Sequence, residues 1–259
     1  MNKVAKPVVI KVGGGALAGG ALEDLPDLLS GGHKVAVVHG GGVQLTRMLD
    51  ALGIPTRFHA GLRVTDESTL EVAEIVLAGG INKNLARWLN GMGVPSAGIS
   101  GTDGPTLLVE AVPELGRVGK VVQVETRLIE ALWDGGFVPV VAPLGMGPEG
   151  AYNVNADSAA ADLAVGLGAG HLFLLTDVDG LLEEGETVEA IAADECEVYV
   201  ERGLAAGGMV PKLRAAAGAA RGGVQARILN GNRKGALAAA VAGERIGTLI
   251  SEGVAACKQ

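Results

Sequence analysis

Short runs of apolar, mostly β-branched residues alternate with longer segments of helical periodicity, and this alternation restricts the fold more than any other feature of the sequence. The expected strands are Val8–Val12, Val35–Val38, Val94–Ile99, Val138–Val141, Leu172–Leu175 and Ala226–Leu229. The expected helices are Val43–Leu52, Thr69–Leu89, Thr126–Trp133, Asp157–Leu167 and Lys212–Ala220. Strands that are apolar throughout are typical of a parallel sheet whose two faces are both covered by helices. The sequence therefore predicts an α/β fold.

One segment departs from this alternation. Thr106–Val112 and Gly119–Val124 alternate apolar and polar residues, and the turn-forming sequence Pro113-Glu114-Leu115-Gly116 joins them. This pattern predicts a β-hairpin inserted into the α/β order. The hairpin is either a flap beside a binding site or a plain extension of the sheet.

The chain length permits either one large α/β domain or two lobes of unequal size. With 259 residues the chain can bury a core without disulfides or metals. A helix followed by a glycine-rich turn at Gly166–Gly170 is the best candidate for a boundary. We therefore expect an N-terminal lobe of residues 1–168 and a C-terminal lobe of residues 169–259.

Composition excludes several classes of function. The chain has 21 Lys+Arg against 29 Asp+Glu, a net charge of −8, whereas nucleic acid and anionic membranes require a basic surface. Two cysteines, with no Cys-x-x-Cys or His-Glu-x-x-His motif, predict neither a disulfide framework nor a transition-metal site. No apolar run approaches the ~20 residues of a membrane span or forms the core of a signal peptide. We expect a cytoplasmic protein in a reducing compartment.

Two glycine runs follow the first two expected strands. The first strand leads into Lys11 and Gly13–Gly15, and the second leads into His39 and Gly40–Gly42, directly before a helix. Because glycine makes up 42 of the 259 residues, triplets also arise by chance, and their position carries the argument. Consecutive backbone N–H groups at a helix N-terminus bind phosphate or another oxyanion at the carboxyl edge of an α/β sheet. These runs, with the charge of Lys11, predict an anion site; plain turns are the alternative.

The common nucleotide-binding fingerprints are absent. The sequence contains no Gly-x-x-x-x-Gly-Lys-Ser/Thr motif and no His-Arg-Asp or Asp-Phe-Gly motif of a protein kinase. A dinucleotide-binding unit requires an acidic residue at the end of the second strand, where this chain has His39. An oxidoreductase is therefore disfavoured.

Polar residues suited to holding a substrate occur at two further places. Arg63 precedes a long helix that Thr65 or Asp66 is expected to cap, and its guanidinium suits a bidentate contact with a carboxylate. Asn153 and Asn155 are spaced to project on the same side of an extended segment. The alternatives are a solvated surface arginine and ordinary helix capping.

Charged residues at the ends of later elements complete the candidate site. Asp157 opens a helix, where it is placed to orient lysines rather than to accept a proton. Asp177–Leu182 follows a strand, which suits a ribose or base contact, although a simple turn explains it equally. Pro211 is expected at the first helical position, which puts Lys212 in the first turn. A lysine there opposes the helix dipole and favours phosphate binding over stability.

Six motifs occur in an order and spacing that resemble the amino acid kinase family. They are KVGGG from Lys11, HGGG from His39, GLRVTD from Gly61, NVNAD from Asn153, TDVDGLL from Thr176 and GGMVPK from Gly207. Within this family they look most similar to the enzymes that phosphorylate N-acetyl-L-glutamate in arginine biosynthesis. The resemblance implies a three-layer αβα sandwich with a mainly parallel open sheet. It also implies an N-terminal lobe that binds the amino acid and forms a homodimer, and a C-terminal lobe that binds ATP.

The resemblance also assigns site residues, in three groups. Around the transferring phosphoryl group it places Lys11, Lys212, Asp157, Gly14 and Gly41. Around the amino-acid substrate it places Gly41, Gly42, Arg63, Asn153 and Asn155. Around the nucleotide it places Asp177, Val178, Asp179, Gly180, Leu181, Leu182, Leu204, Ala205 and Ala206. The two lysines and the glycine N–H groups would stabilise the transferring group, and Asp157 would position the lysines.

The chemistry of such a transfer agrees with the residues present. A γ-carboxylate with a reference pKa near ~4.3 is already ionised at neutral pH, so the nucleophile needs no general base. The site then has to align two anions and to neutralise the charge of the phosphoryl oxygens. Lysines, backbone N–H groups and Mg²⁺ held mainly by ATP can do this. We expect no protein-held metal.

Two further expectations concern the first crossover and the assembly, and several rival functions have to be distinguished from this one. The crossover between Lys11 and His39 is short and contains Pro26, so the first crossover helix is predicted to be brief. The chain begins ten residues before Lys11, without the extra N-terminal helix of arginine-inhibited, hexameric members of the family, so the resemblance implies an arginine-insensitive dimer. One rival function is a carrier-protein-linked aminoadipate or glutamate kinase of lysine biosynthesis. Its carrier protein is acidic, so the net charge of −8 disfavours it. The other rival is a catalytically silent amino-acid sensor, which the presence of both Lys11 and Lys212 disfavours. Glutamate 5-kinase, aspartokinase and carbamate kinase leave the GLRVTD motif unexplained.

Overall fold

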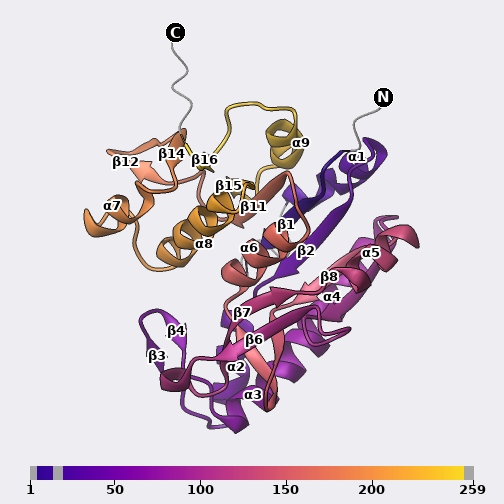
Figure 1. Cartoon of the computed structure of the whole chain (residues 1–259), viewed down its shortest axis with the longest axis vertical. Helices are drawn as coiled ribbons and strands as arrows, with labels where there is room; N and C mark the ends of the chain where they lie inside the picture. Colours follow the sequence, from indigo (N-terminus) through magenta and orange to yellow (C-terminus); the bar gives the residue numbers. More distant parts are fainter. Residues whose placement is uncertain (1–4, 14–19, 254–259) are drawn as a thin grey trace.

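An eight-stranded sheet runs through the molecule (Figure 1). The computed structural model describes residues 5–13 and 20–253. In spatial order the strands are β14 (Ala190–Ala192), β16 (Thr248–Ser251), β15 (Gln225–Asn230), β11 (His171–Thr176), β1 (Val8–Val12), β2 (Val35–His39), β8 (Val138–Ala142) and β5 (Ser96–Ser100). Among these described strands, only β15 and β16 pair in antiparallel orientation. The expected mainly parallel open sheet is confirmed.

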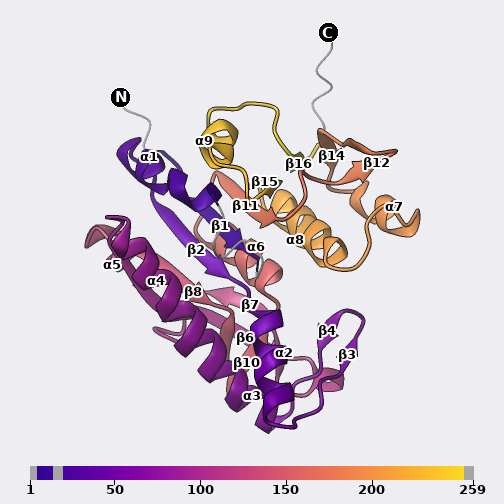
Figure 2. The same cartoon turned by 180° about the vertical axis from the view of Figure 1, so that it is seen from behind.

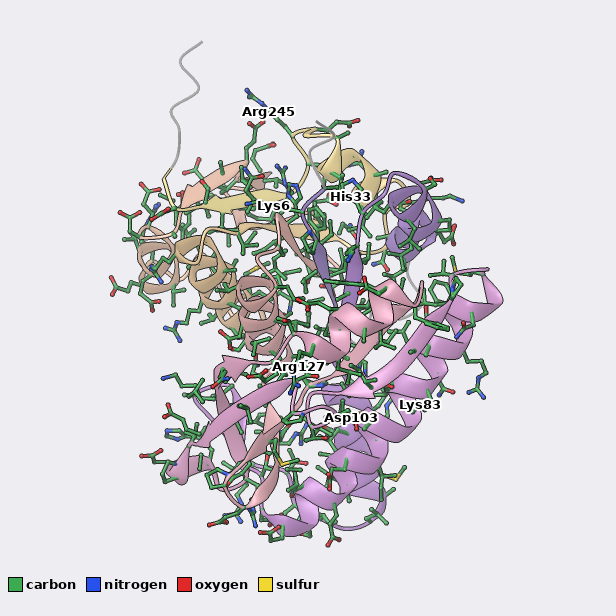
Figure 3. All side chains as sticks on the ribbon, turned by 45° about the vertical axis from the view of Figure 1, so that its right-hand side comes forward. Lys6, His33, Lys83, Asp103, Arg127 and Arg245 are labelled. Atoms are coloured by element: carbon green, nitrogen blue, oxygen red, sulfur yellow. The ribbon has the colours of Figure 1, made fainter. Side chains whose placement is uncertain are left out.

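Helices cover both faces of this sheet (Figures 1 and 2). One face carries α5 (Arg127–Asp134), α6 (Ala156–Gly166) and α8 (Met209–Arg221). The other face carries α1 (Leu25–Ser30), α4 (Asn82–Gly91) and α9 (Ala236–Val241). Each layer shares its own cluster of buried apolar side chains with the sheet, while charged side chains such as Arg127 and Arg245 lie at the surface (Figure 3). The fold is therefore the expected three-layer αβα sandwich.

Side-chain alternation along the central strands decides which residues face which layer. In β1, Val9 packs into the cluster of α6 and α8, whereas Val12 packs into the cluster of α4. Successive side chains of a strand point to opposite faces, so Lys11 points with Val9 towards α6. His39 is the register partner of Val12 and points towards α4. Lys11 and His39 thus lie at the same edge of the sheet but on opposite faces.

The predicted hairpin is present, but it does not extend the main sheet. Its strands β6 (Leu107–Ala111) and β7 (Val118–Val124) pair in antiparallel orientation. They close a small four-stranded barrel with β9 (Leu144–Gly147) and β10 (Gly150–Val154), a second hairpin that the sequence did not predict. Glycines in β9 and β10 weaken the strand signal, because glycine has little intrinsic preference for strands. The barrel leads directly into α6.

The long helix expected over Thr69–Leu89 is present but is not a single α-helix. It consists of α3 (Glu67–Ala73), a π-helical segment η2 (Glu74–Ile81) and α4. A π-helix bonds each N–H to the carbonyl five residues earlier, which widens the turn and is frequent at functional sites. Apolar periodicity does not separate this geometry from an α-helix, so the expectation was wrong in this respect.

The remaining elements are short. They are the 3₁₀ turns η1 (Gly20–Asp24) and η3 (Pro113–Leu115), the helices α2 (Gly42–Ala51) and α7 (Cys196–Glu201), and the hairpins β3 (Phe58–His59) with β4 (Leu62–Arg63) and β12 (Leu182–Glu183) with β13 (Glu186–Thr187). The first crossover consists of η1 and α1 and is brief, as expected. The division into lobes near residue 168 remains a prediction, because one sheet passes through both halves.

Two helical glycines should respond oppositely to alanine. A Cβ on Gly166 in α6 would lie 2.6 Å from Cβ of Val124, an atom that cannot rotate away. We expect Gly166→Ala to lower the free energy of unfolding by about 1–3 kcal/mol, the usual effect of overpacking. A Cβ on Gly218 in α8 would have no atom within 4 Å, and Gly218→Ala should raise stability by roughly 0.5–1 kcal/mol. Urea unfolding followed by circular dichroism measures both, and equal effects would contradict this packing.

Candidate active site

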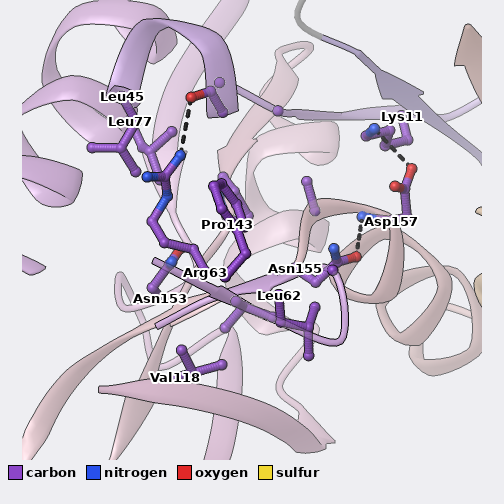
Figure 4. A pocket seen from close by; sticks show the side chains of 17 residues that line it. Lys11, Leu45, Leu62, Arg63, Leu77, Val118, Pro143, Asn153, Asn155 and Asp157 are labelled. Atoms are coloured by element: carbon purple, nitrogen blue, oxygen red, sulfur yellow. Dashed lines mark hydrogen bonds and ion pairs between the residues drawn. The ribbon is translucent and has the colours of Figure 1, made fainter. Parts of the chain in front are cut away.

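Two lysines share one buried carboxylate at the carboxyl end of β1. Nζ of Lys11 lies 2.7 Å from Oδ1 of Asp157 in the first turn of α6 (Figure 4). Nζ of Lys212, in the first turn of α8, lies 3.6 Å from the other oxygen, Oδ2. Lys11 and Asp157 are 4% and 5% exposed. The cluster therefore keeps a positive charge that one carboxylate does not balance, and it suits an anionic ligand.

Burial acts directly on the ammonium group of Lys11. Removal from water lowers the pKa of Lys11 below its usual value, and the positive charge of Lys212 acts in the same direction. The carboxylate of Asp157 opposes this shift. A ligand phosphate would supply a further negative charge that favours the protonated form of Lys11.

The glycine run after β2 lies beside this cluster. The N–H of Gly40 donates to the carbonyl of Val12 at 2.8 Å, which ties the loop to the end of β1. Gly41 and Gly42 start α2, where N–H groups lack a carbonyl acceptor within the helix. A Cβ on Gly41 would lie 2.6 Å from Cδ2 of Leu77, so the end of this η2 side chain packs directly against the glycine and would have to move to admit a larger residue. Gly14, of the first glycine run, lies outside the described residues.

Arg63 lies at the opposite end of the same pocket and is 8% exposed. Its guanidinium donates to Oγ1 of Thr46 at 2.8 Å, to Oγ1 of Thr56 at 3.2 Å and to the carbonyl of Gly42 at 3.2 Å, and it lies 4.9 Å from the ring centroid of Phe58. In the part of the chain that the structure describes, no carboxylate forms a salt bridge with it. A buried, preoriented cation without an acidic partner is suited to a ligand carboxylate.

The surroundings of Arg63 differ from the sequence prediction in one respect. Arg63 belongs to the β3–β4 hairpin rather than to a loop, because Phe58 pairs with it across a tight turn. Asp66 caps α3 as expected, with its carboxylate accepting from the N–H of Thr69 at 2.8 Å. The hairpin is too short for an apolar alternation to reveal it in the sequence.

The two asparagines of the NVNAD motif make different hydrogen bonds. Asn153 in β10 donates from Nδ2 to Oγ1 of Thr65 at 3.1 Å. Asn155 caps α6, with its Oδ1 accepting from the N–H groups of Asp157 and Ser158 at 3.0 Å each. Both asparagines line the pocket (Figure 4). The capping role and a place at the pocket therefore coexist for Asn155.

One pocket of about 250 Å³ joins these groups. The charged cluster of Lys11 and Asp157 forms one end and Arg63 forms the other (Figure 4), and the glycine run also lines the pocket. Apolar side chains form the rest of the wall: Leu45, Phe58, Leu62, Leu77, Val118, Pro143 and Val154. No sequence signal marks this apolar wall, because its residues come from separate strands, helices and hairpins. The pocket fits a small molecule with anionic groups at both ends and an apolar middle.

The segments expected at the nucleotide lie in the C-terminal half, and neither lines this pocket. Asp177–Leu182 follows β11; Asp179 accepts from Nδ2 of Asn230 at 2.8 Å, and the N–H of Leu181 donates to Oγ1 of Thr248 at 2.9 Å. Leu204, Ala205 and Ala206 lie in the loop between α7 and α8. α8 begins at Met209, so Pro211 is its third residue rather than its first. Lys212 still falls in the first turn.

Comparison with known proteins identifies the family of this chain. Residues 6–230 match the model of the amino acid kinase family. The chain belongs to the amino acid kinase family. A protein of Rubrobacter xylanophilus named acetylglutamate kinase is 70% identical over 247 residues, which cover 95% of this chain and 98% of that protein. A protein of Kosmotoga olearia with the same name is 40% identical, with coverage of 95% and 91%. The solved structure of smu.665 from Streptococcus mutans UA159 has a TM-score of 0.84 at 29% identity, with coverage of 95% and 98%.

Membrane spans and metal clusters are both missing from the described residues of this family member. None of the helices within residues 5–13 and 20–253 has the length and apolarity needed to cross a membrane. Within the same ranges, no three His, Cys, Asp or Glu side chains are grouped so that they could hold a metal ion.

His39 is a buried member of the site, although the sequence marks it only as the residue that ends a strand. Its Nδ1 lies 2.8 Å from the carbonyl oxygen of Gly40, and its Nε2 lies 3.2 Å from Nδ2 of Asn82. Nδ2 of Asn82 also lies 2.8 Å from the carbonyl of Val140 and 3.0 Å from that of Ile99, so its two hydrogens are shared among three acceptors, whereas Nδ1 of His39 faces a carbonyl that can only accept. The ring must therefore carry its proton on Nδ1 and be neutral. Burial lowers the pKa of His39 to about 4.

This histidine should make stability depend on pH. Between pH 6.5 and about 4 the unfolded chain binds a proton at His39 that the folded protein does not, so stability falls as pH falls. We expect a loss of about 2 kcal/mol from this residue between pH 7 and pH 5. His39→Asn removes the titrating group, and urea unfolding at both pH values compares the two proteins. An equal loss in wild type and variant would contradict the assignment.

Proposed function

We propose that this chain transfers the γ-phosphoryl group of ATP to the γ-carboxylate of N-acetyl-L-glutamate, a step of arginine biosynthesis that forms N-acetyl-L-glutamyl 5-phosphate and ADP. The observation that carries this proposal is the pocket with Lys11 and Asp157 at one end, where Lys212 also reaches Asp157 from outside the lining, and with Arg63, which forms no salt bridge among the described residues, at the other. Such a pocket matches a substrate with a carboxylate at each end. The name of the 70% identical relative, acetylglutamate kinase, supports the same reaction.

In this reaction a γ-carboxylate oxygen forms a bond to the γ-phosphorus while the bond from that phosphorus to the ADP oxygen breaks. The carboxylate is ionised before it reacts, so no proton has to be removed. Lys11 and Lys212 neutralise charge on the phosphoryl oxygens, and Asp157 holds the two ammonium groups at the carboxyl end of β1. The N–H groups of Gly41 and Gly14 contact those oxygens. Electrostatic stabilisation and alignment supply the rate enhancement.

The amino acid is held by the other end of the pocket. Arg63 binds its α-carboxylate, and Asn153 and Asn155 donate hydrogen bonds to its polar groups. Gly42 contributes backbone contacts at the start of α2. The apolar wall then surrounds the carbon chain between the two carboxylates.

ATP reaches the site from the C-terminal lobe, along Asp177–Leu182 and Leu204–Ala206. Mg²⁺ accompanies the nucleotide and withdraws charge from its phosphates. The carboxylate of Asp157 is already engaged by two ammonium groups, so the metal is carried by the phosphates rather than by this residue. We further infer a cytoplasmic homodimer whose N-terminal lobe forms the interface.

Substrate selectivity tests this function directly. We expect ATP-dependent formation of an acyl phosphate, trapped with hydroxylamine as a hydroxamate, with N-acetyl-L-glutamate and not with glutamate, aspartate or aminoadipate. Product with aminoadipate or glutamate presented on a carrier protein, and none with any free amino acid, would favour the carrier-linked kinase. ATP binding without product from any substrate would favour the silent sensor.

Substitutions at the two ends of the pocket should separate binding from transfer. Lys212→Met should lower kcat by roughly 10²–10³-fold with a small change in KM, because its charge acts on the transition state. Arg63→Gln should raise the KM for N-acetyl-L-glutamate by roughly 10–100-fold, the value of a hydrogen-bonded charge pair, and should alter the KM for ATP little. Steady-state kinetics with each substrate varied measures both. A rise in KM without a fall in kcat for Lys212→Met, or a fall in kcat without a rise in KM for Arg63→Gln, would contradict the proposed roles.

A further inference from the structure

The orientation of one peptide unit decides where the glycine run presents its N–H groups. The carbonyl of Gly40 and the N–H of Gly41 belong to the same planar, trans peptide, so they point in opposite directions. The carbonyl accepts a hydrogen bond from Nδ1 of His39 at 2.8 Å. The N–H of Gly40, at the preceding peptide, donates to Val12 at 2.8 Å. Fixing the carbonyl of Gly40 on the His39 side therefore aims the N–H of Gly41 away from that side.

Side chains of the π-helical segment η2 pack against the same stretch of the loop. The side chains of Leu77 and Ile81 lie so close to Gly41 that a Cβ there would collide with both. These side chains are held in turn by the apolar cluster that also contains Leu45 and Leu49 of α2. The loop is thus in contact both with the ring of His39 and with the side chains of η2.

Asn82, the first residue after η2, fixes the ring of His39. Its Nδ2 lies 2.8 Å from the carbonyl of Val140 in β8, 3.0 Å from that of Ile99 in β5, and 3.2 Å from Nε2 of His39. Its side chain is buried, and its Oδ1 accepts from Nζ of Lys83 at 3.2 Å. The widened turn of η2 ends directly before Asn82.

A purely structural requirement does not explain this arrangement well. Two buried polar side chains in the interior lose their contacts with water, and an apolar pair of the same volume would fill the space without that cost. A π-helical segment is also rare and is found mainly where function requires it. Both features converge on the peptide between Gly40 and Gly41.

We propose that His39 and Asn82 are positioning residues for phosphoryl transfer, which act by holding the Gly40–Gly41 peptide so that the N–H of Gly41 points at the transferring group. This inference rests on the proposed kinase function. Asn82 fixes the ring, the neutral ring donates from Nδ1 to the carbonyl of Gly40, and the planar peptide carries this orientation to the N–H of Gly41. Neither side chain touches the substrate or the phosphoryl group.

A matched pair of variants at His39 tests the proposal. The amide of Asn reaches the position of Nδ1, whereas the amide of Gln reaches the position of Nε2. His39→Gln loses the donor to the carbonyl of Gly40, and we expect it to lower kcat by roughly 10–100-fold with little change in either KM. The expected loss is smaller than that from removing an oxyanion-hole donor outright, because the N–H of Gly41 is misdirected and not removed. His39→Asn should recover most of the lost kcat. Equal kcat in the two variants, or a change confined to KM, would overturn the proposal.

A second measurement does not depend on how stable the His39 variants are. Asn82→Ala removes the group that fixes the ring and should also lower kcat with little change in KM; wild-type kcat in a folded Asn82→Ala protein would overturn the proposal. The backbone amide of Gly41 is followed by NMR when ADP, aluminium fluoride and N-acetyl-L-glutamate are added. We expect a large downfield shift of its proton in the wild type and a smaller one in Asn82→Ala. Equal shifts would count against the positioning role.

The two proposals fail in different ways. If the wild type forms no acyl phosphate, the proposed function is wrong whatever the variants do. If the wild type is active and the His39 and Asn82 variants match it in kcat, only the positioning role is wrong. Long-range ¹H–¹⁵N spectra of the wild type report independently on the neutral ring with its proton on Nδ1, and a ring protonated on Nε2 would overturn the inference.

Discussion

Two ammonium groups on one buried carboxylate hold together the three elements that meet at the site. Asp157 lies 2.7 Å from Lys11 and 3.6 Å from Lys212. An unpaired charge in such surroundings costs on the order of several kcal/mol, so β1, α6 and α8 have to bring these residues to one point. The negative charge of Asp157 also lies at the N-terminal end of α6, where the helix dipole stabilises it. The excess positive charge leaves the cluster better satisfied when an anion is bound.

The two faces of the sheet contribute differently at this edge. Lys11 faces α6 and supplies charge, whereas His39 faces α4 and makes only neutral hydrogen bonds. The glycine run lies between them and presents backbone N–H groups. In the proposed reaction, the charged groups attract an anionic ligand over a distance, and the short-range hydrogen bonds on the other face fix the direction of the backbone groups. This division follows from strand alternation in β1 and β2.

The substrate wall comes from parts of the chain outside the main sheet. The barrel contributes Val118 and Asn153, and the β3–β4 hairpin contributes Leu62 and Arg63. Both contain antiparallel hairpins attached to the edge where the parallel strands end, and the two hairpins of the barrel pair with each other in parallel orientation. Ligands of open α/β sheets bind beyond the carboxyl ends of the strands, and these additions close that space around a small molecule.

The sequence by itself determined the α/β class, the central strands and the main polar residues of the pocket, but not its apolar wall, because apolar periodicity and motif chemistry are local properties. Lys11 was identified from its place at the end of an expected strand, Arg63 from its place in a loop before an expected helix, and Asp157 from its place at the start of another. Only the tertiary structure decided the barrel, the π-helical geometry of η2, and the contact of His39 with Asn82. These features depend on packing between segments far apart in the chain, where a widened turn or a short glycine-containing strand is selected by its neighbours and leaves no periodic signal of its own.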